Sequence, residues 1–104
     1  MRQFDVYANP LPAARHAYPY LVLLQSDITA DGRDRIVAPV VPRRSLTPVA
    51  GRLTPVVRLG TTEYVVLVHA LSAIRARDLV DARGSLAESR AEMLAAIDCL
   101  FFGV

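Results

Sequence analysis

The stretch SLAESRAEMLAAIDCLFFGV, residues 85–104, decides the fold, because its pattern is that of a capped amphipathic helix. Ser85 and Glu88 have the S-x-x-E spacing of a capping box, in which the serine oxygen accepts from an orphan amide and the glutamate reaches back. Gly103 is placed to stop the helix. We therefore expect a helix over residues 85–101. Its apolar residues recur at three- and four-residue spacing and form one face. They are Leu86, Met93, Leu94, Ile97, Leu100 and Phe101.

Upstream of this stretch, the pattern is that of strands joined by turns. Residues 4–7 alternate in polarity, as a strand does. Residues 18–28 are too apolar to alternate cleanly and predict a long, mostly buried strand. The Asp31-Gly32 pair is typical of a tight turn, and residues 35–41 follow as a strand, so the two strands form a predicted hairpin.

The middle of the chain adds further strands. Residues 42–51 predict a loop, residues 54–59 and 63–69 predict strands, and residues 71–80 favour another extended segment, although their pattern is ambiguous. Five or more strands thus precede a single helix. We expect a mainly β fold, a small antiparallel sheet or barrel with one C-terminal α-helix packed on it.

The composition points to apolar surface that a partner covers. The chain has 104 residues, which predicts one domain over residues 1–104. Its hydrophobic fraction of 53% and mean hydropathy of +0.31 are high for a small soluble domain. No apolar run approaches the roughly 20 residues needed to span a bilayer, and the N-terminus lacks the apolar core of a secretory signal. We therefore expect no membrane association, and a homodimer is the simplest partner.

The cysteine content and the charge pattern argue against a disulfide-stabilised protein and against a nucleic-acid-binding protein. Cys99 is the single cysteine, so no internal disulfide framework exists, which fits a reducing cytoplasm. All 12 basic residues are arginine, and the net charge is +2. Apart from the pairs Arg33/Arg35 and Arg43/Arg44, the arginines are scattered along the sequence, whereas a nucleic-acid stripe needs clustering on one face. We expect no direct nucleic-acid binding by the chain itself.

Candidate catalytic groups lack partners. His16 and His69 belong to no motif, and Ser26-Asp27 at a strand end is better explained by a turn than by a nucleophile. Cys99 within the helix is better explained as a small apolar filler. The spacings of metal ligands and the glycine-rich loops that hold phosphates are missing. We expect a protein that is not an enzyme and has no cofactor and no metal.

The chain end is the unusual feature, because it finishes on apolar side chains without a polar tail. We expect Leu100 and Phe101 to dock on the core as part of the helix face. Phe102 and Val104 lie beyond that face. If they are exposed, they mark an interaction site.

Four motifs in this order resemble the CcdB family of toxins from plasmid and chromosomal toxin–antitoxin pairs. They are the strand Phe4–Tyr7, the segment Gln25–Ile28, the segment Pro55–Gly60 and the ending Phe101–Val104. The likeness runs nearly end to end, and the motifs are fairly specific only in combination. It implies an SH3-like antiparallel barrel of the CcdB/MazF type with a long C-terminal helix. It also implies a homodimer whose helix ends lie near the two-fold axis.

The resemblance also implies a function. Family members bind the A subunit of DNA gyrase and trap the state that holds cleaved DNA. A CcdA-like antitoxin neutralises them with a disordered segment that folds on binding. The toxin–antitoxin complex represses its own operon, so contact with operator DNA is expected only for the complex.

Carried over by position, the family's gyrase-contacting tail falls on Phe102, Gly103 and Val104. Further gyrase contacts fall on Ser26, Ile28, Asp98 and Phe101. Two of these positions depart from the family's pattern, which has Trp at the position of Phe102 and Asn at that of Asp98.

The antitoxin-facing surface is less defined by sequence. We assign it to the loop that contains Leu11 and Arg15 and to the pair Arg43 and Arg44. Two alternative functions stay open. The same fold carries MazF/Kid-type ribonuclease toxins, which use arginine with aspartate or histidine, and a non-toxic homologue would only bind antitoxin.

Overall fold

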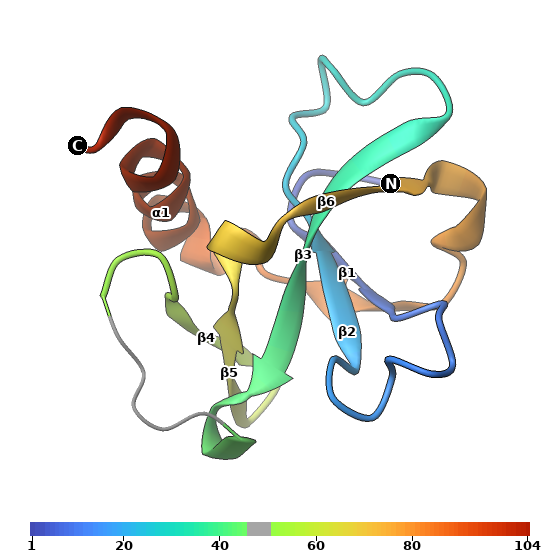
Figure 1. The fold of residues 1–104 in the computed structure, drawn as a ribbon, viewed down its shortest axis with the longest axis horizontal. Coiled ribbons are helices and arrows are strands. Elements are labelled where there is room, and N and C mark those ends of the chain that lie inside the picture. Colours follow the sequence, from blue (N-terminus) through green and yellow to red (C-terminus); the bar gives the residue numbers. More distant parts are fainter. Residues whose placement is uncertain (46–50) are drawn as a thin grey trace.

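A computed structural model describes residues 1–45 and 51–104 of the chain, and the description below refers to these residues. Seven strands form one antiparallel sheet, and one α-helix packs against it (Figure 1). This confirms the predicted fold class. The strands are β1 (Asp5–Ala8), β2 (Tyr20–Leu23), β3 (Asp34–Pro42), β4 (Val56–Leu59), β5 (Thr62–Val66), β6 (Ser72–Arg75) and β7 (Ala82–Ser85). The helix is α1 (Arg90–Phe102), and short 3-10 turns are η1 (Arg43–Ser45), η2 (Val68–Ala70), η3 (Ala76–Asp78) and η4 (Ala87–Ser89).

The strand β3 organises the sheet. The strand order is β4-β5-β3-β2-β1-β7. One edge of β3 is shared by two strands, because β6 pairs with its first half and β5 pairs with its second half. Pro39 lies between these two halves, after the last residue paired with β6 (Val37) and before the first paired with β5 (Val40). Proline lacks a backbone donor, so it is accommodated where β3 changes partner.

The predicted hairpin is confirmed, with a first strand (β2) shorter than the predicted residues 18–28 and a second strand (β3) one residue longer at each end than the predicted residues 35–41. β2 and β3 pair from Tyr20 opposite Val40 to Leu23 opposite Val37. The Leu24 amide still donates to the carbonyl of Ile36 over 2.9 Å, and residues 25–33 form a long loop instead of a tight turn. Gly32 adopts a φ of +80° within this loop. The predicted strand over residues 18–28 therefore ends early, although Leu24 remains buried.

Two apolar clusters cover opposite faces of the central strands. One contains Val22 and Val40, receives the helix, and is the larger. The other contains Leu21, Leu23 and Val37. Since neighbouring residues of a strand point to opposite faces, a strand buried on both faces reads as a continuous apolar run. This explains why residues 18–28 do not alternate.

The predicted start of the helix at Ser85 is wrong. Ser85 is the last residue of β7 and pairs with Asp5, and the amide of Leu86 donates to the carbonyl of Phe4 over 2.8 Å. The Ser85 hydroxyl accepts from the amide of Ala87, not of Glu88 as a capping box requires. Strand pairing with the N-terminus therefore overrides the local capping signal, and the α-helix begins at Arg90.

The segment from Leu71 to Val80 is only partly extended, because η3 interrupts it after β6. The strand β7 was not predicted, since its residues Ala82–Ser85 are all exposed and carry no apolar pattern. The predicted strands over residues 4–7, 54–59 and 63–69 correspond to β1, β4 and β5. The predicted loop over residues 42–51 includes residues 46–50, which lie outside the described residues.

The sheet curls so that its two edge strands approach each other. Gly84 of β7 has a φ of +140°, and a Cβ at this position would lie 2.8 Å from Cδ1 of Leu59 in β4. A side chain larger than hydrogen would therefore require the Leu59 side chain to shift. Glycine at this position allows β7 to close against β4.

We predict that Gly84→Ala lowers the free energy of unfolding by about 2 to 4 kcal/mol, because a φ of +140° is almost confined to glycine and the Leu59 side chain must also shift. Urea denaturation measures the change. Gly32→Ala is the control for an ordinary left-handed φ, since Gly32 has a φ of +80° and open space around it. It should cost only about 1 kcal/mol. Equal losses in the two variants would show that neither the φ of +140° nor the contact with Leu59 adds to the cost of a left-handed residue.

Candidate functional site

The end of helix α1 projects into solvent. Gly103 ends the helix with a φ of +71°, and its amide donates to the carbonyl of Cys99 over 3.1 Å. This confirms the predicted stop. Phe102 is 75% exposed and Val104 is 67% exposed. Phe101 is 60% exposed, so the expectation that it docks on the core is wrong.

The preceding turns of α1 are fixed on the core. Met93 and Ala96 are fully buried, and Leu100 is partly buried against the larger apolar cluster. Phe101 follows Leu100 by about 100° around the helix axis, so its ring lies off the apolar cluster that holds Leu100. The helix is therefore anchored on one side while its last residues stay free for contact.

A shallow apolar groove joins the helix end to the loop between β2 and β3. It has a volume of about 300 Å³ and lies next to both elements, which reach the same end of the molecule (Figure 1). The lining residues are Leu24, Gln25, Ile36, Leu71, Ile97 and Phe101. An apolar groove beside exposed aromatic side chains is typical of a surface that binds another macromolecule.

The loop side of the groove carries two of the expected contact residues. Ile28 is 94% exposed, which is unusual for a large apolar side chain. Ser26 holds the turn, because its hydroxyl lies 3.1 Å from that of Thr29 and its carbonyl accepts from the Thr29 amide. The loop geometry thus presents Ile28 outward.

The N-terminal segment ties this loop to the helix. The amide of Gln3 donates to Asp27 over 2.8 Å, and its side-chain nitrogen donates to the carbonyl of Leu24 over 2.9 Å. The side-chain oxygen of Gln3 accepts from Arg90 of α1 over 3.0 Å. The next residue, Phe4, is buried at a φ of +70°, a strained conformation for a bulky side chain. No motif in the sequence singles out Gln3, so its role was not predicted.

We call the set of expected gyrase contacts the C-terminal surface. Phe101 lines the groove on its helix side, Ser26 follows the lining residue Gln25 on its loop side, and Asp98 is exposed on α1 one turn before the end. The C-terminal surface comprises Ser26, Ile28, Asp98, Phe101, Phe102, Gly103 and Val104.

The residues assigned to the antitoxin lie elsewhere. Leu11 is exposed and Arg15 donates through Nε to the carbonyl of Asn9, in the loop that precedes β2. Arg43 pairs with Glu63 over 3.0 Å, just after the end of β3. The start of β2 pairs with the end of β3, so both sites lie at the end of this hairpin opposite the loop that carries Ile28 (Figure 1).

Arg44 lies close to a pair of tyrosines at the same end. The Tyr20 and Tyr64 rings pack edge to face, with centroids 5.7 Å apart. Burial and the neighbouring Tyr20 raise the pKa of Tyr64, and the positive charge of Arg44 opposes this shift. Within residues 1–45 and 51–104, no cluster of three or more metal-ligating side chains occurs. No helix among these residues has the length and apolarity to cross a membrane.

Comparison with known proteins gives one family. The family model described as CcdB protein matches residues 3–103 of the chain. A search of curated proteins finds no match.

We predict that Phe102→Ser changes the free energy of unfolding by less than about 0.5 kcal/mol, because the ring is mostly exposed. Met93→Ala on the buried side of the same helix should cost about 2 to 5 kcal/mol. Chemical denaturation of both variants measures the difference. A large loss for Phe102→Ser would mean that its ring is needed for folding.

We predict that Gln3→Ala loosens the loop that carries Ile28. The variant removes the side-chain hydrogen bonds from Gln3 to the Leu24 carbonyl and to Arg90 of α1, and it keeps only the backbone bond to Asp27. Hydrogen exchange of the Leu24–Thr29 amides should become faster while exchange in β5 stays unchanged. Arg2→Ala is the control, since the Arg2 bond to Asp5 uses its backbone amide. Unchanged exchange in the loop would exclude this tether.

Proposed function

The chain belongs to the CcdB family, whose members are toxins of toxin–antitoxin pairs, and we propose that this toxin acts by poisoning DNA gyrase. In this proposal, it binds the A subunit of gyrase in the cytoplasm and traps the complex that holds cleaved DNA. It acts by binding and not as an enzyme. A CcdA-like antitoxin neutralises it, and the pair represses its own operon.

One observation carries the proposal, the exposure of Phe101, Phe102 and Val104 beside an apolar groove. Removing apolar surface from water contributes roughly 25 cal/mol per Å². Aromatic side chains are also enriched among the residues that dominate binding energy at interfaces. The C-terminal surface therefore has the composition of a binding surface.

Each residue of the tail has a chemical use in such a contact. The Phe102 ring can face an arginine of the A subunit in a cation–π contact, worth roughly 0.5 to 2 kcal/mol. Gly103 has no side chain, and nothing lies within 4 Å of the position a Cβ would take, so another backbone can approach closely. The Val104 carboxylate can pair with a basic group. Asp98 adds a charge at the rim, where the family has a neutral amide.

The trapping step follows from differential affinity. A ligand shifts a conformational equilibrium only to the extent that it binds one state better than the other. We propose that the C-terminal surface fits the A subunit in the conformation that holds cleaved DNA. Bound toxin then disfavours the return to the religated state, and the gyrase complex becomes a source of double-strand breaks.

We also propose that the toxin is a homodimer. Supporting this, α1 carries apolar residues beyond the side that packs on the core, including Ala91, Ala95 and Phe101. A helix that is apolar on more than one side is usually covered on more than one side. Sedimentation equilibrium tests the proposal, and a monomer at all concentrations would contradict it.

The antitoxin is proposed to contact Leu11, Arg15, Arg43 and Arg44. Their place at the far end of the β2–β3 hairpin supports a contact that does not compete directly with gyrase for the C-terminal surface. A disordered antitoxin segment that folds on binding can wrap a large surface. It can therefore contact both the loop with Leu11 and Arg15 and the pair Arg43 and Arg44.

The experiment for the proposed function uses purified toxin, gyrase and supercoiled plasmid with ATP. Detergent and protease then release any trapped breaks. We expect linear plasmid to accumulate, and RNA added in a parallel reaction to remain intact. Cleavage of RNA without any effect on gyrase would establish a ribonuclease toxin instead. No effect on either substrate, with tight antitoxin binding, would identify a non-toxic homologue.

We predict that Gly103→Glu abolishes linearisation, because its side chain blocks the close approach of the A subunit that glycine allows. The protein should stay folded, because the position lies past the helix in open space. Circular dichroism checks the fold. Phe102→Trp should keep or raise potency by up to about tenfold, since indole presents a better cation–π face. A large loss of potency in Phe102→Trp would mean that the ring fills a closed pocket.

A further inference from the structure

Within residues 1–45 and 51–104, the fold leaves one aspartate, Asp98 of α1, without a polar partner. Its side chain is exposed, and in these parts of the chain its carboxylate forms no hydrogen bond or ion pair. Each of the other aspartates accepts a hydrogen bond or lies beside an arginine. They are Asp5, Asp27, Asp31, Asp34, Asp78 and Asp81.

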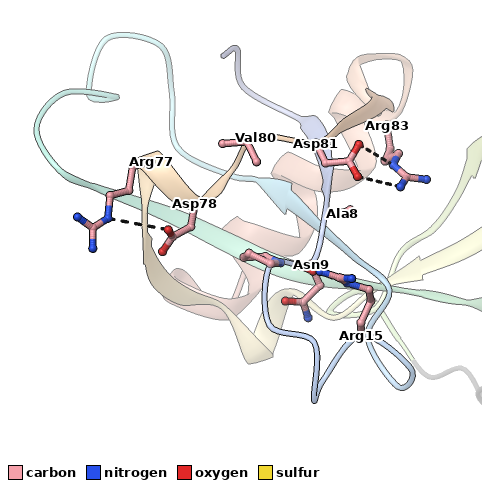
Figure 2. Close-up of a pocket in the computed structure, with 9 residues that line it drawn as sticks. Ala8, Asn9, Arg15, Arg77, Asp78, Val80, Asp81 and Arg83 are labelled. Carbon is pink, nitrogen blue, oxygen red and sulfur yellow. Dashed lines mark hydrogen bonds and ion pairs between the residues drawn. The ribbon is translucent and has the colours of Figure 1, made fainter.

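Around β6 and β7, the aspartates are paired because arginines gather there. Pairing of β3 with β6 brings together the arginines that line a cavity of about 320 Å³, which are Arg33, Arg75 and Arg77. Asp78 lies 3.9 Å from Arg77, and Asp81 accepts two hydrogen bonds from Arg83, over 3.0 and 2.8 Å (Figure 2). The charges of this region therefore largely satisfy one another, whereas the charge at the end of α1 does not.

The other charges of α1 give Asp98 no support. The C-terminal end of a helix carries partial negative charge, which favours a basic residue and not an acidic one. Glu92 lies in the favourable first turn, and the last turn has no basic residue. Arg90, the one basic residue of α1, accompanies Gln3 and the Phe4 ring. It precedes Asp98 by about 12 Å along the axis, beyond the screening length of roughly 8 Å at physiological salt.

Two exposed rings flank the Asp98 carboxylate. Phe101 and Phe102 follow Asp98 by three and four residues, so the three side chains are neighbours on the surface of α1. Helical side chains lean towards the N-terminus, which brings both rings back over the turn that carries Asp98. The face of an aromatic ring attracts a cation. The helix end thus combines a carboxylate and ring faces that one cation can contact together.

We infer that the end of α1 binds a guanidinium group of the partner and that Asp98 is the residue that selects this cation. A flat guanidinium can stack on the Phe102 ring while its edge donates to the Asp98 carboxylate. An ammonium group forms the ion pair without this stacking, so arginine fits better than lysine.

The inference deepens the proposed function and rests on it for the identity of the partner. It adds the chemistry that the contacted surface of the A subunit must present. A neutral or acidic residue opposite Asp98 would leave the carboxylate desolvated without compensation. The charge of Asp98 therefore restricts which partner surfaces the C-terminal surface accepts.

The direct experiment titrates isotope-labelled, full-length toxin with Nα-acetylarginine amide and follows the amide chemical shifts. We expect saturable binding that weakens with salt, with shifts at Asp98, Phe102 and Gly103. The lysine analogue should bind more weakly. The citrulline analogue has the shape of arginine without its charge and should give no shifts at these positions.

Variants test whether the carboxylate and the ring act on one cation. Asp98→Asn should weaken binding of the arginine analogue about twofold to fivefold, as for an exposed ion pair. Phe102→Leu keeps apolar bulk without the ring face and should also weaken it. Because one cation uses both groups, the double variant should lose less than the product of the two single losses.

The matched control is Glu92→Gln, which removes the same charge from an exposed position of the same helix and should bind the arginine analogue normally. Absence of saturable shifts, equal binding of the citrulline analogue, or an equal loss in Glu92→Gln would overturn the inference. A lower melting temperature of Asp98→Asn would also overturn it, because the carboxylate would then serve the fold.

Binding of the gyrase A subunit separates this inference from the proposed function. Asp98→Asn should bind the A subunit about twofold to fivefold more weakly, with a shallower salt dependence, and Glu92→Gln should bind it normally. Binding of the arginine analogue by a toxin that does not bind gyrase would remove the gyrase proposal and keep the cation site. Gyrase binding that Asp98→Asn leaves unchanged would keep the gyrase proposal and overturn the inference.

Discussion

The double pairing of β3 is the constraint on which the rest of the structure depends. One edge of this nine-residue strand holds β2, and the other edge holds β6 and then β5. The β2 pairing sets where the loop with Ile28 emerges. The β6 pairing sets where η3 and Arg77 emerge. The loop with Ile28 and the arginines beside β6 are thus both positioned by the register of one strand, and a slip by one residue would turn every side chain to the wrong face.

Much of the fold follows from local patterns in the sequence. The hairpin, the strands β1, β4 and β5, and the glycine that stops the helix are all readable from polarity and turn residues. The start of the helix and β7 are not. Both depend on pairing with Asp5 at the far end of the chain, and the exposed residues of β7 carry no apolar signal. Long-range pairing overrides a local capping motif here because it satisfies several backbone groups at once.

The candidate site shows the same division. The exposed tail was predicted from its composition, but Phe101 was placed on the core because helical spacing alone does not show where the sheet ends beneath the helix. The role of Gln3 and the grouping of Arg33, Arg75 and Arg77 depend on contacts between residues far apart in sequence, such as Gln3 with Arg90 and Arg33 with Ala76. Arginines that are scattered along the chain become neighbours only when β6 is laid against β3.

The closure of β7 against β4 has a consequence for how this protein recognises others. An open sheet edge is a template that accepts any extended chain through its backbone groups. The Leu59 side chain stands over Gly84 and obstructs this route at the β7 edge. This contact hinders addition of a foreign strand at β7 and so removes one route to indiscriminate pairing through backbone groups.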